Sequence, residues 1–196
     1  EGGLFIVTAL LIARLGEVPA AAHQIAINVA ALCFMVPMGL AEATTVRVGH
    51  ALGAGDPHGV RRAVRAGYVI VLATQALSGL VLLLGHDAIV AVYTRDAAVA
   101  ALASVLLLYA AAFQFPDGIQ VMAAGALRGL RDTRVPMFLA AASYWGLGMS
   151  LGAWLGLYRG GGAPGMWAGL IVGLVAAAVL MGARLATRLH RLPPPV

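Results

Sequence analysis

Charge and cysteine are both scarce in this sequence. Charged residues make up 11% of its 196 residues, against about 25% in soluble domains, and all thirteen basic residues are arginine. With a single cysteine, Cys33, the chain can form no internal disulfide and no cysteine-rich metal site. It also has no soluble basic face of the kind that binds nucleic acid. Hydrophobic residues reach 61% and the mean hydropathy is +0.91, which indicates an integral membrane protein.

Apolar stretches long enough to cross a hydrocarbon core of about 30 Å recur along the chain. They lie at about 19–45, 66–85, 98–127, 135–158 and 164–186, and a shorter one runs from Leu4 to Ala13. Short charged or glycine-rich segments separate them. The pattern predicts an all-α membrane protein built as a bundle of six helices. Because the sequence opens on Glu1 rather than methionine, we expect residues 1–196 to be part of a longer protein, with the first helix cut at its start.

The arginines divide unevenly between the two ends of these helices. If the first helix runs outward, ten arginines face the cytoplasm and three face outward. The ten are Arg47, Arg61, Arg62, Arg65, Arg128, Arg131, Arg134, Arg184, Arg188 and Arg191; the three are Arg14, Arg95 and Arg159. Cytoplasmic loops of membrane proteins carry such an excess. Both ends of the chain are therefore predicted to be cytoplasmic, and the arginines can contact anionic membrane lipids.

One acid, Asp117, lies inside a long apolar stretch and directly follows Pro116. A charge at the bilayer centre costs at least about 2.5 kcal/mol, so this acid must face a partner helix or a cavity. A proline inside a helix also leaves a carbonyl without its hydrogen bond, which suits a cation site. The alternative is a structural acid with a paired partner. At helical spacings of three and four, Asp117 shares a face with Phe113, Gln114, Gln120 and Ala124.

Other polar residues in the predicted helices are interpreted as structural. Glu42 lies near a cytoplasmic end and is expected to pair with Arg47 at the membrane interface. His23 lies near the outer end of its helix, where we expect an interfacial hydrogen bond rather than a proton relay.

Three segments closely resemble the second half of multidrug and toxic compound extrusion (MATE) transporters, in their bacterial NorM-like branch. They are AAHQIAINVAALCFMVPMGLAEATTVRVGHALGAGD, FQFPDGIQVMAAGALRGLRDTRVP and SYWGLGMSLGAWLG. The resemblance implies a twelve-helix transporter made of two pseudo-symmetric six-helix lobes. Residues 1–196 would then form the C-terminal lobe, with helices seven to twelve, and the N-terminal lobe would be its partner.

The resemblance also implies a function and a site. Such transporters export cationic or amphipathic drugs across the bacterial cytoplasmic (inner) membrane in exchange for Na⁺ or H⁺, and need no other cofactor. The coupling cation would bind Glu1 and Asp117. Phe113, Gln114 and Gln120, which share a helical face with Asp117, are expected to support the cavity. The family has a tyrosine one turn before the second acid, where this sequence has Phe113. That difference removes a hydroxyl and weakens the case for sodium.

Two other classes of protein are weighed against a drug exporter. An intramembrane enzyme would need a nucleophile, but Ser78 before Gly79 has Ala76 where a rhomboid-like motif has glycine, so we expect no enzyme. A lipid or oligosaccharide flippase of a related fold stays open, because a fold by itself does not define a substrate.

Overall fold

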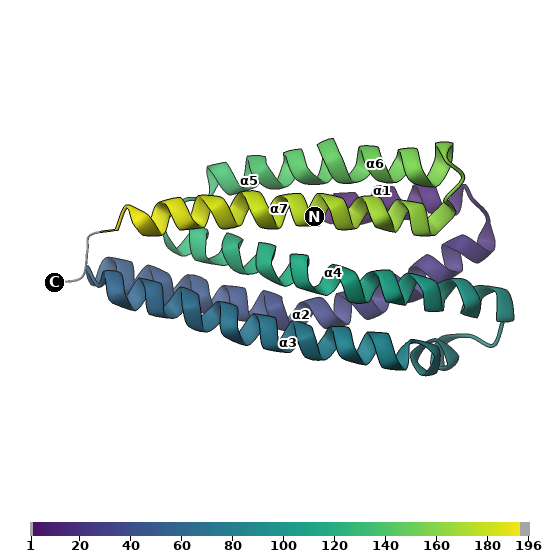
Figure 1. Ribbon diagram of the computed structural model, residues 1–196, viewed down its shortest axis with the longest axis horizontal. Helices are drawn as coiled ribbons and strands as arrows, with labels where there is room; N and C mark the ends of the chain where they lie inside the picture. Colours follow the sequence, from purple (N-terminus) through teal and green to yellow (C-terminus); the bar gives the residue numbers. More distant parts are fainter. Residues whose placement is uncertain (1, 193–196) are drawn as a thin grey trace.

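The computed structural model describes residues 2–192, and all the regular structure in this range is helical. In chain order the elements are α1 (Gly2–Ala13), α2 (Glu17–Gly53), α3 (Pro57–Tyr93), α4 (Ala97–Gly129), α5 (Arg134–Ala141), η1 (Ala142–Met149), α6 (Ser150–Ala153), η2 (Trp154–Tyr158) and α7 (Gly162–His190). Among them α2, α3, α4 and α7 are long and apolar enough to cross a membrane. The elements from α5 to η2 follow one another without a break and form a further rod (Figure 1). The predicted all-α six-helix bundle is confirmed.

Two of the long helices, α3 and α4, begin at aspartate caps. The Asp56 side chain accepts a hydrogen bond from the Gly59 backbone N–H at 2.8 Å, and Pro57 occupies the first turn of α3. Asp96 caps α4 in the same way, accepting from the N–H groups of Ala98 at 2.9 Å and Val99 at 3.0 Å. These caps fix the two polar turns on either side of α3.

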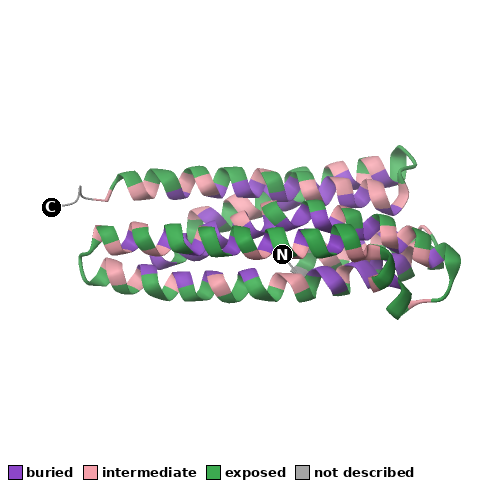
Figure 2. Ribbon diagram, turned by 60° about the horizontal axis from the view of Figure 1, so that its bottom comes forward, coloured by how far each residue is buried: buried purple, intermediate pink, exposed green. Residues whose placement is uncertain are grey.

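The helix α4 occupies the centre of the bundle. It packs against α2, α3 and α7, and α7 packs in turn against the rod from α5 to η2 (Figure 1). Buried residues face inward, and the outer surface of the bundle is mostly exposed (Figure 2). Large apolar side chains are common on that surface; Leu84 is 79% exposed and Val92 85%. An apolar exterior is what a lipid environment requires.

Glycines permit the close approach of neighbouring helices. A Cβ at Gly125 would lie 2.6 Å from the Ala41 carbonyl oxygen of α2, and one at Gly129 would lie 2.8 Å from the Thr45 carbonyl oxygen. On α7, a Cβ at Gly169 would overlap the backbone of Gly152 in α6. Membrane helices associate through such small residues, because lipid supplies no hydrophobic force between them.

Several charged side chains join helices at the end of the bundle that holds the C-terminus. Asp132 accepts from Arg184 Nε at 2.9 Å, and Arg188 Nε lies 3.4 Å from the same oxygen. Glu42 pairs with Arg128 Nη1 at 2.9 Å, so the predicted Glu42–Arg47 pair is wrong. Residues five apart on a helix point in different directions. Arg128 approaches Glu42 from α4 instead.

Candidate functional site

Asp117 lies inside the bundle and is only 4% exposed. Its helix, α4, continues through Pro116 to Gly129, so the carboxylate lies twelve residues, or about 18 Å, from the end of the helix. This is too deep for a short acidic side chain to reach water at the membrane surface. This burial agrees with the expectation that Asp117 faces the interior of the bundle rather than lipid.

The Asp117 side chain borders a cavity of about 280 Å³ between α1, α2, α4, η1 and α7. Aromatic and aliphatic side chains form most of the wall. The lining residues are Phe5, Ile27, Ala30, Ala31, Phe34, Phe113, Asp117, Tyr144, Leu170 and Leu174. Among these residues only Asp117 and Tyr144 bring polar side-chain atoms. The cavity therefore combines an apolar, aromatic surface with one carboxylate, and this combination suits an organic cation.

Phe113 forms the wall one helical turn before the acid. Its ring is 3% exposed, and its centroid lies 6.2 Å from that of Trp167 in α7. A tyrosine here would add a hydroxyl, whereas phenylalanine adds only apolar surface. The side-chain oxygen atoms at this wall of the cavity are thus those of Asp117 and Tyr144.

The residues of the face predicted for α4 do not all line the cavity. Gln114 is not part of the cavity lining; its backbone oxygen accepts from Gln75 Nε2 of α3 at 2.7 Å, and its side-chain oxygen accepts from the same nitrogen at 3.1 Å. Gln120 is 2% exposed and also lies outside the lining. Consecutive residues on a helix point about 100° apart, so Phe113 and Gln114 meet different partners. Gln114 therefore joins α3 to α4.

Glu1, the second predicted ligand of a coupling cation, lies outside the described residues. Phe5, in the first helix, does line the cavity. Within residues 2–192, no group of three His, Cys, Asp or Glu side chains could hold a metal ion. The described part of the site is a single carboxylate with aromatic neighbours.

Two features of the interior were missed by the sequence analysis. His23 is 2% exposed, and its Nδ1 accepts from Trp167 Nε1 at 3.1 Å, so its hydrogen bond is made inside the bundle, to α7. Its Nε2 is buried and has no hydrogen-bond partner in the described structure. Small residues at 22, 26 and 30 mark this packed face of α2 and could have indicated burial. Tyr144 lies in the π-helical segment η1, which no sequence signal predicted.

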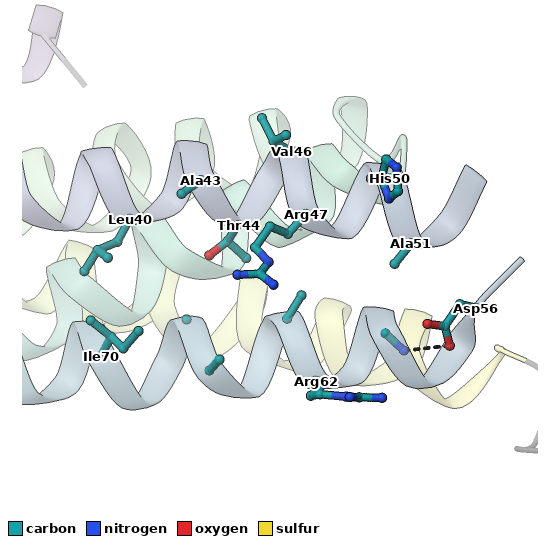
Figure 3. Close-up of a pocket in the computed structure, with 14 residues that line it drawn as sticks. Leu40, Ala43, Thr44, Val46, Arg47, His50, Ala51, Asp56, Arg62 and Ile70 are labelled. Atoms are coloured by element: carbon teal, nitrogen blue, oxygen red, sulfur yellow. Dashed lines mark hydrogen bonds between the residues drawn. The ribbon is translucent and has the colours of Figure 1, made fainter. Parts of the chain in front are cut away.

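A second, larger hollow lies away from Asp117. It measures about 580 Å³ and runs between α2 and α3 at the end of the bundle that holds the α2–α3 turn (Figure 3). It is more polar and more open than the cavity at Asp117. The larger of the two hollows is therefore not the one that contains Asp117.

The chain was compared with known families and proteins. The MatE family model matches residues 1–154. The chain is 76% identical over 192 residues to a probable multidrug resistance protein NorM of Xanthomonas campestris pv. campestris, covering 98% of this chain and 42% of that protein. It is 64% identical over 184 residues to a protein of the same name from Xylella fastidiosa, covering 94% of this chain and 39% of that protein.

A solved structure shares the fold. The crystal structure of a eukaryotic MATE transporter, AtDTX14, aligns with a TM-score of 0.88 at 20% identity, over 96% of this chain and 44% of that one. The chain thus spans about two fifths of the length of the relatives it matches.

These matches decide one of the alternatives raised by the sequence and confirm the membrane location. Proteins of this family are not enzymes, so Ser78 is not a catalytic nucleophile. The apolar helices, with these relatives, make the chain a multi-pass integral protein of the bacterial inner membrane. It belongs to the MatE family of multidrug and toxic compound extrusion transporters, in the NorM-like branch.

Proposed function

We propose that residues 1–196 form the C-terminal lobe, helices seven to twelve, of a cation-coupled antiporter. The whole protein exports cationic or amphipathic compounds across the inner membrane in exchange for protons or sodium ions. The observation that carries this proposal is the buried Asp117 carboxylate on an aromatic cavity. The names of the relatives, which are multidrug resistance proteins, support the same class of substrate.

Asp117 and Glu1 together bind the coupling cation. A buried carboxylate loses the water that stabilises its charge, and a bound proton or metal cation restores that stabilisation. Sodium needs several oxygen ligands, and Phe113 withholds the hydroxyl that a tyrosine would offer. This substitution favours the proton over sodium.

The exported compound uses the same cavity by a different combination of contacts. Its positive charge is attracted by the carboxylate and by aromatic faces such as those of Phe34 and Tyr144. Its apolar part contacts the aliphatic wall. Exchange then requires only that the coupling ion and the drug favour different conformations of the two lobes.

The test uses the full-length protein with Asp117→Asn, which removes the charge and keeps the shape. Efflux of a fluorescent cationic dye is measured under an imposed proton or sodium gradient, with membrane levels of the protein matched. Asp87→Asn is the control, because that carboxylate is 83% exposed near the C-terminal end of α3 and does not line the cavity. We expect gradient-driven efflux to fall by at least about tenfold in Asp117→Asn, because the coupling ion loses the charge that holds it, and to stay unchanged in the control.

Parental efflux with unchanged gradient dependence in Asp117→Asn would make this acid structural. Glu1→Gln should behave like Asp117→Asn. A flippase of the same fold is the competing function. It predicts translocation of lipid-linked sugars, with no drug efflux, by the parental protein.

A further inference from the structure

The groove between α2 and α3 collects basic side chains from both helices. Arg47 and His50 line it from α2, and Arg62 lines it from α3. Figure 3 shows the Arg47 side chain extending into the space between the two helices. The hydroxyl of Thr44 and the carboxylate of Asp56 are the other polar groups of the lining. The mouth of the groove therefore carries more positive than negative charge.

Other arginines at this end of the bundle already have partners. Arg184 and Arg188 contact Asp132, and Arg128 contacts Glu42. Arg61, the neighbour of Arg62, donates to the carbonyl oxygens of Leu189 and Leu192.

Arg47 and Arg62, by contrast, make no ion pair or hydrogen bond to any residue in the described part of the chain. Among the described residues, Asp56 forms no ion pair with either arginine; its carboxylate accepts the Gly59 N–H as the cap of α3. Two guanidinium groups that have no ion-pair partner among the described residues thus line one hollow. They match an anion with several oxygen atoms, since arginine donates to phosphate through paired N–H groups.

The wall of the groove continues as apolar surface beyond the arginines. It extends along α2 from Arg47 back to Leu40, seven residues or about 10 Å. On α3 it reaches Ile70, which is 48% exposed, and Val46 beside Arg47 is 70% exposed. A free phosphate ion would use the basic mouth only. A lipid would use both parts, with its acyl chain on the apolar wall.

From this geometry we infer that the groove binds an anionic phospholipid of the cytoplasmic leaflet. Its phosphate lies between Arg47 and Arg62, and an acyl chain runs along Leu40, Ala43 and Ile70. The excess of arginine places this end of the bundle at the cytoplasmic face, where anionic lipids are abundant. A zwitterionic lipid fits less well, because its own positive group competes with the arginines.

The experiment measures lipid retained by the full-length protein. The purified protein is titrated with phosphatidylglycerol or with phosphatidylcholine of the same acyl chains, and bound lipid is counted by native mass spectrometry. The variant is Arg47→Gln with Arg62→Gln. Its control is Arg65→Gln with Arg134→Gln, which removes the same charge from exposed residues of the same end that are not part of the groove lining.

We expect the groove variant to bind phosphatidylglycerol up to about 30-fold more weakly, since each partly exposed guanidinium–phosphate pair that is lost contributes up to roughly a fivefold effect. Phosphatidylcholine binding and the control variant should change little. Equal phosphatidylglycerol binding by the parent and the groove variant would overturn the inference, and would mean that the remainder of the protein covers the groove. Displacement of the lipid by millimolar inorganic phosphate would overturn it as well, because the site would then recognise the anion alone.

Discussion

The contact between α7 and the rod from α5 to η2 depends on glycine, and a single methyl group tests it. In Gly169→Ala the new Cβ would overlap the backbone of Gly152 and lie 2.8 Å from the Gly148 carbonyl oxygen. Neither neighbour is a flexible side chain that can turn away. The two helices must separate, and their remaining contacts weaken.

The expected cost follows from the size of that overlap. Adding a methylene to a well-packed interior costs about 1–3 kcal/mol. The same change inside a helix gains up to about 1 kcal/mol where space is free, because alanine favours the helix over glycine. Gly182→Ala provides that reference on the same helix, since nothing lies within 4 Å of its added Cβ. The stability of Gly173→Ala should lie between those of Gly169→Ala and Gly182→Ala, because its added Cβ would lie 2.8 Å from the Gly148 Cα.

The assay measures the midpoint temperature of thermal unfolding of the full-length protein in detergent. The readout is the fraction of protein that stays monodisperse after heating. We expect Gly169→Ala to have the lower midpoint and Gly182→Ala to equal or exceed the parent. If Gly169→Ala were as stable as Gly182→Ala, the helices would not be in the close contact described, and the role given to these glycines would be refuted.

Two further predictions concern the ends of the bundle. Asp132→Asn should destabilise the protein by about 1.5–3 kcal/mol, because it removes the charge that two arginines of α7 share. Glu42→Gln should cost under about 1 kcal/mol in the same thermal assay, because the carboxylate of the pair that it breaks is 57% exposed. For orientation, Ala54→Cys and Tyr158→Cys in a protein without Cys33 should react oppositely with an impermeant thiol reagent added to intact cells. Labelling at 158 only is expected, and labelling at 54 would reverse the orientation assigned here.

Much of the fold follows from hydropathy, because a bilayer accepts few structures. An apolar stretch in lipid must satisfy its own backbone groups, so each predicted span becomes a helix. The helices observed contain the five long stretches expected. The π-helical segments η1 and η2, which pack against α7, were not predicted, because no local pattern in the sequence indicates them.

The candidate site was predictable in part. Asp117 stood out because a charge in an apolar stretch is costly wherever the helix lies. Its neighbours were harder to assign. The sequence grouped Gln114 with the acid on one helical face, whereas the structure joins it to Gln75. Periodicity shows which residues share a face of one helix, but not which helix lies opposite each edge of that face.

The sequence by itself determined that this chain is a helical membrane protein, which end carries the arginines, and that one buried acid needs a partner. Those conclusions depend on the transfer of single residues from water to lipid, and composition is enough to establish them. Only the tertiary structure decided that Arg128 rather than Arg47 meets Glu42 and that His23 is buried against Trp167. It also decided that two arginines without an ion pair among the described residues share a groove. These contacts join residues far apart in the chain, so they depend on how helices pack, which no local pattern contains.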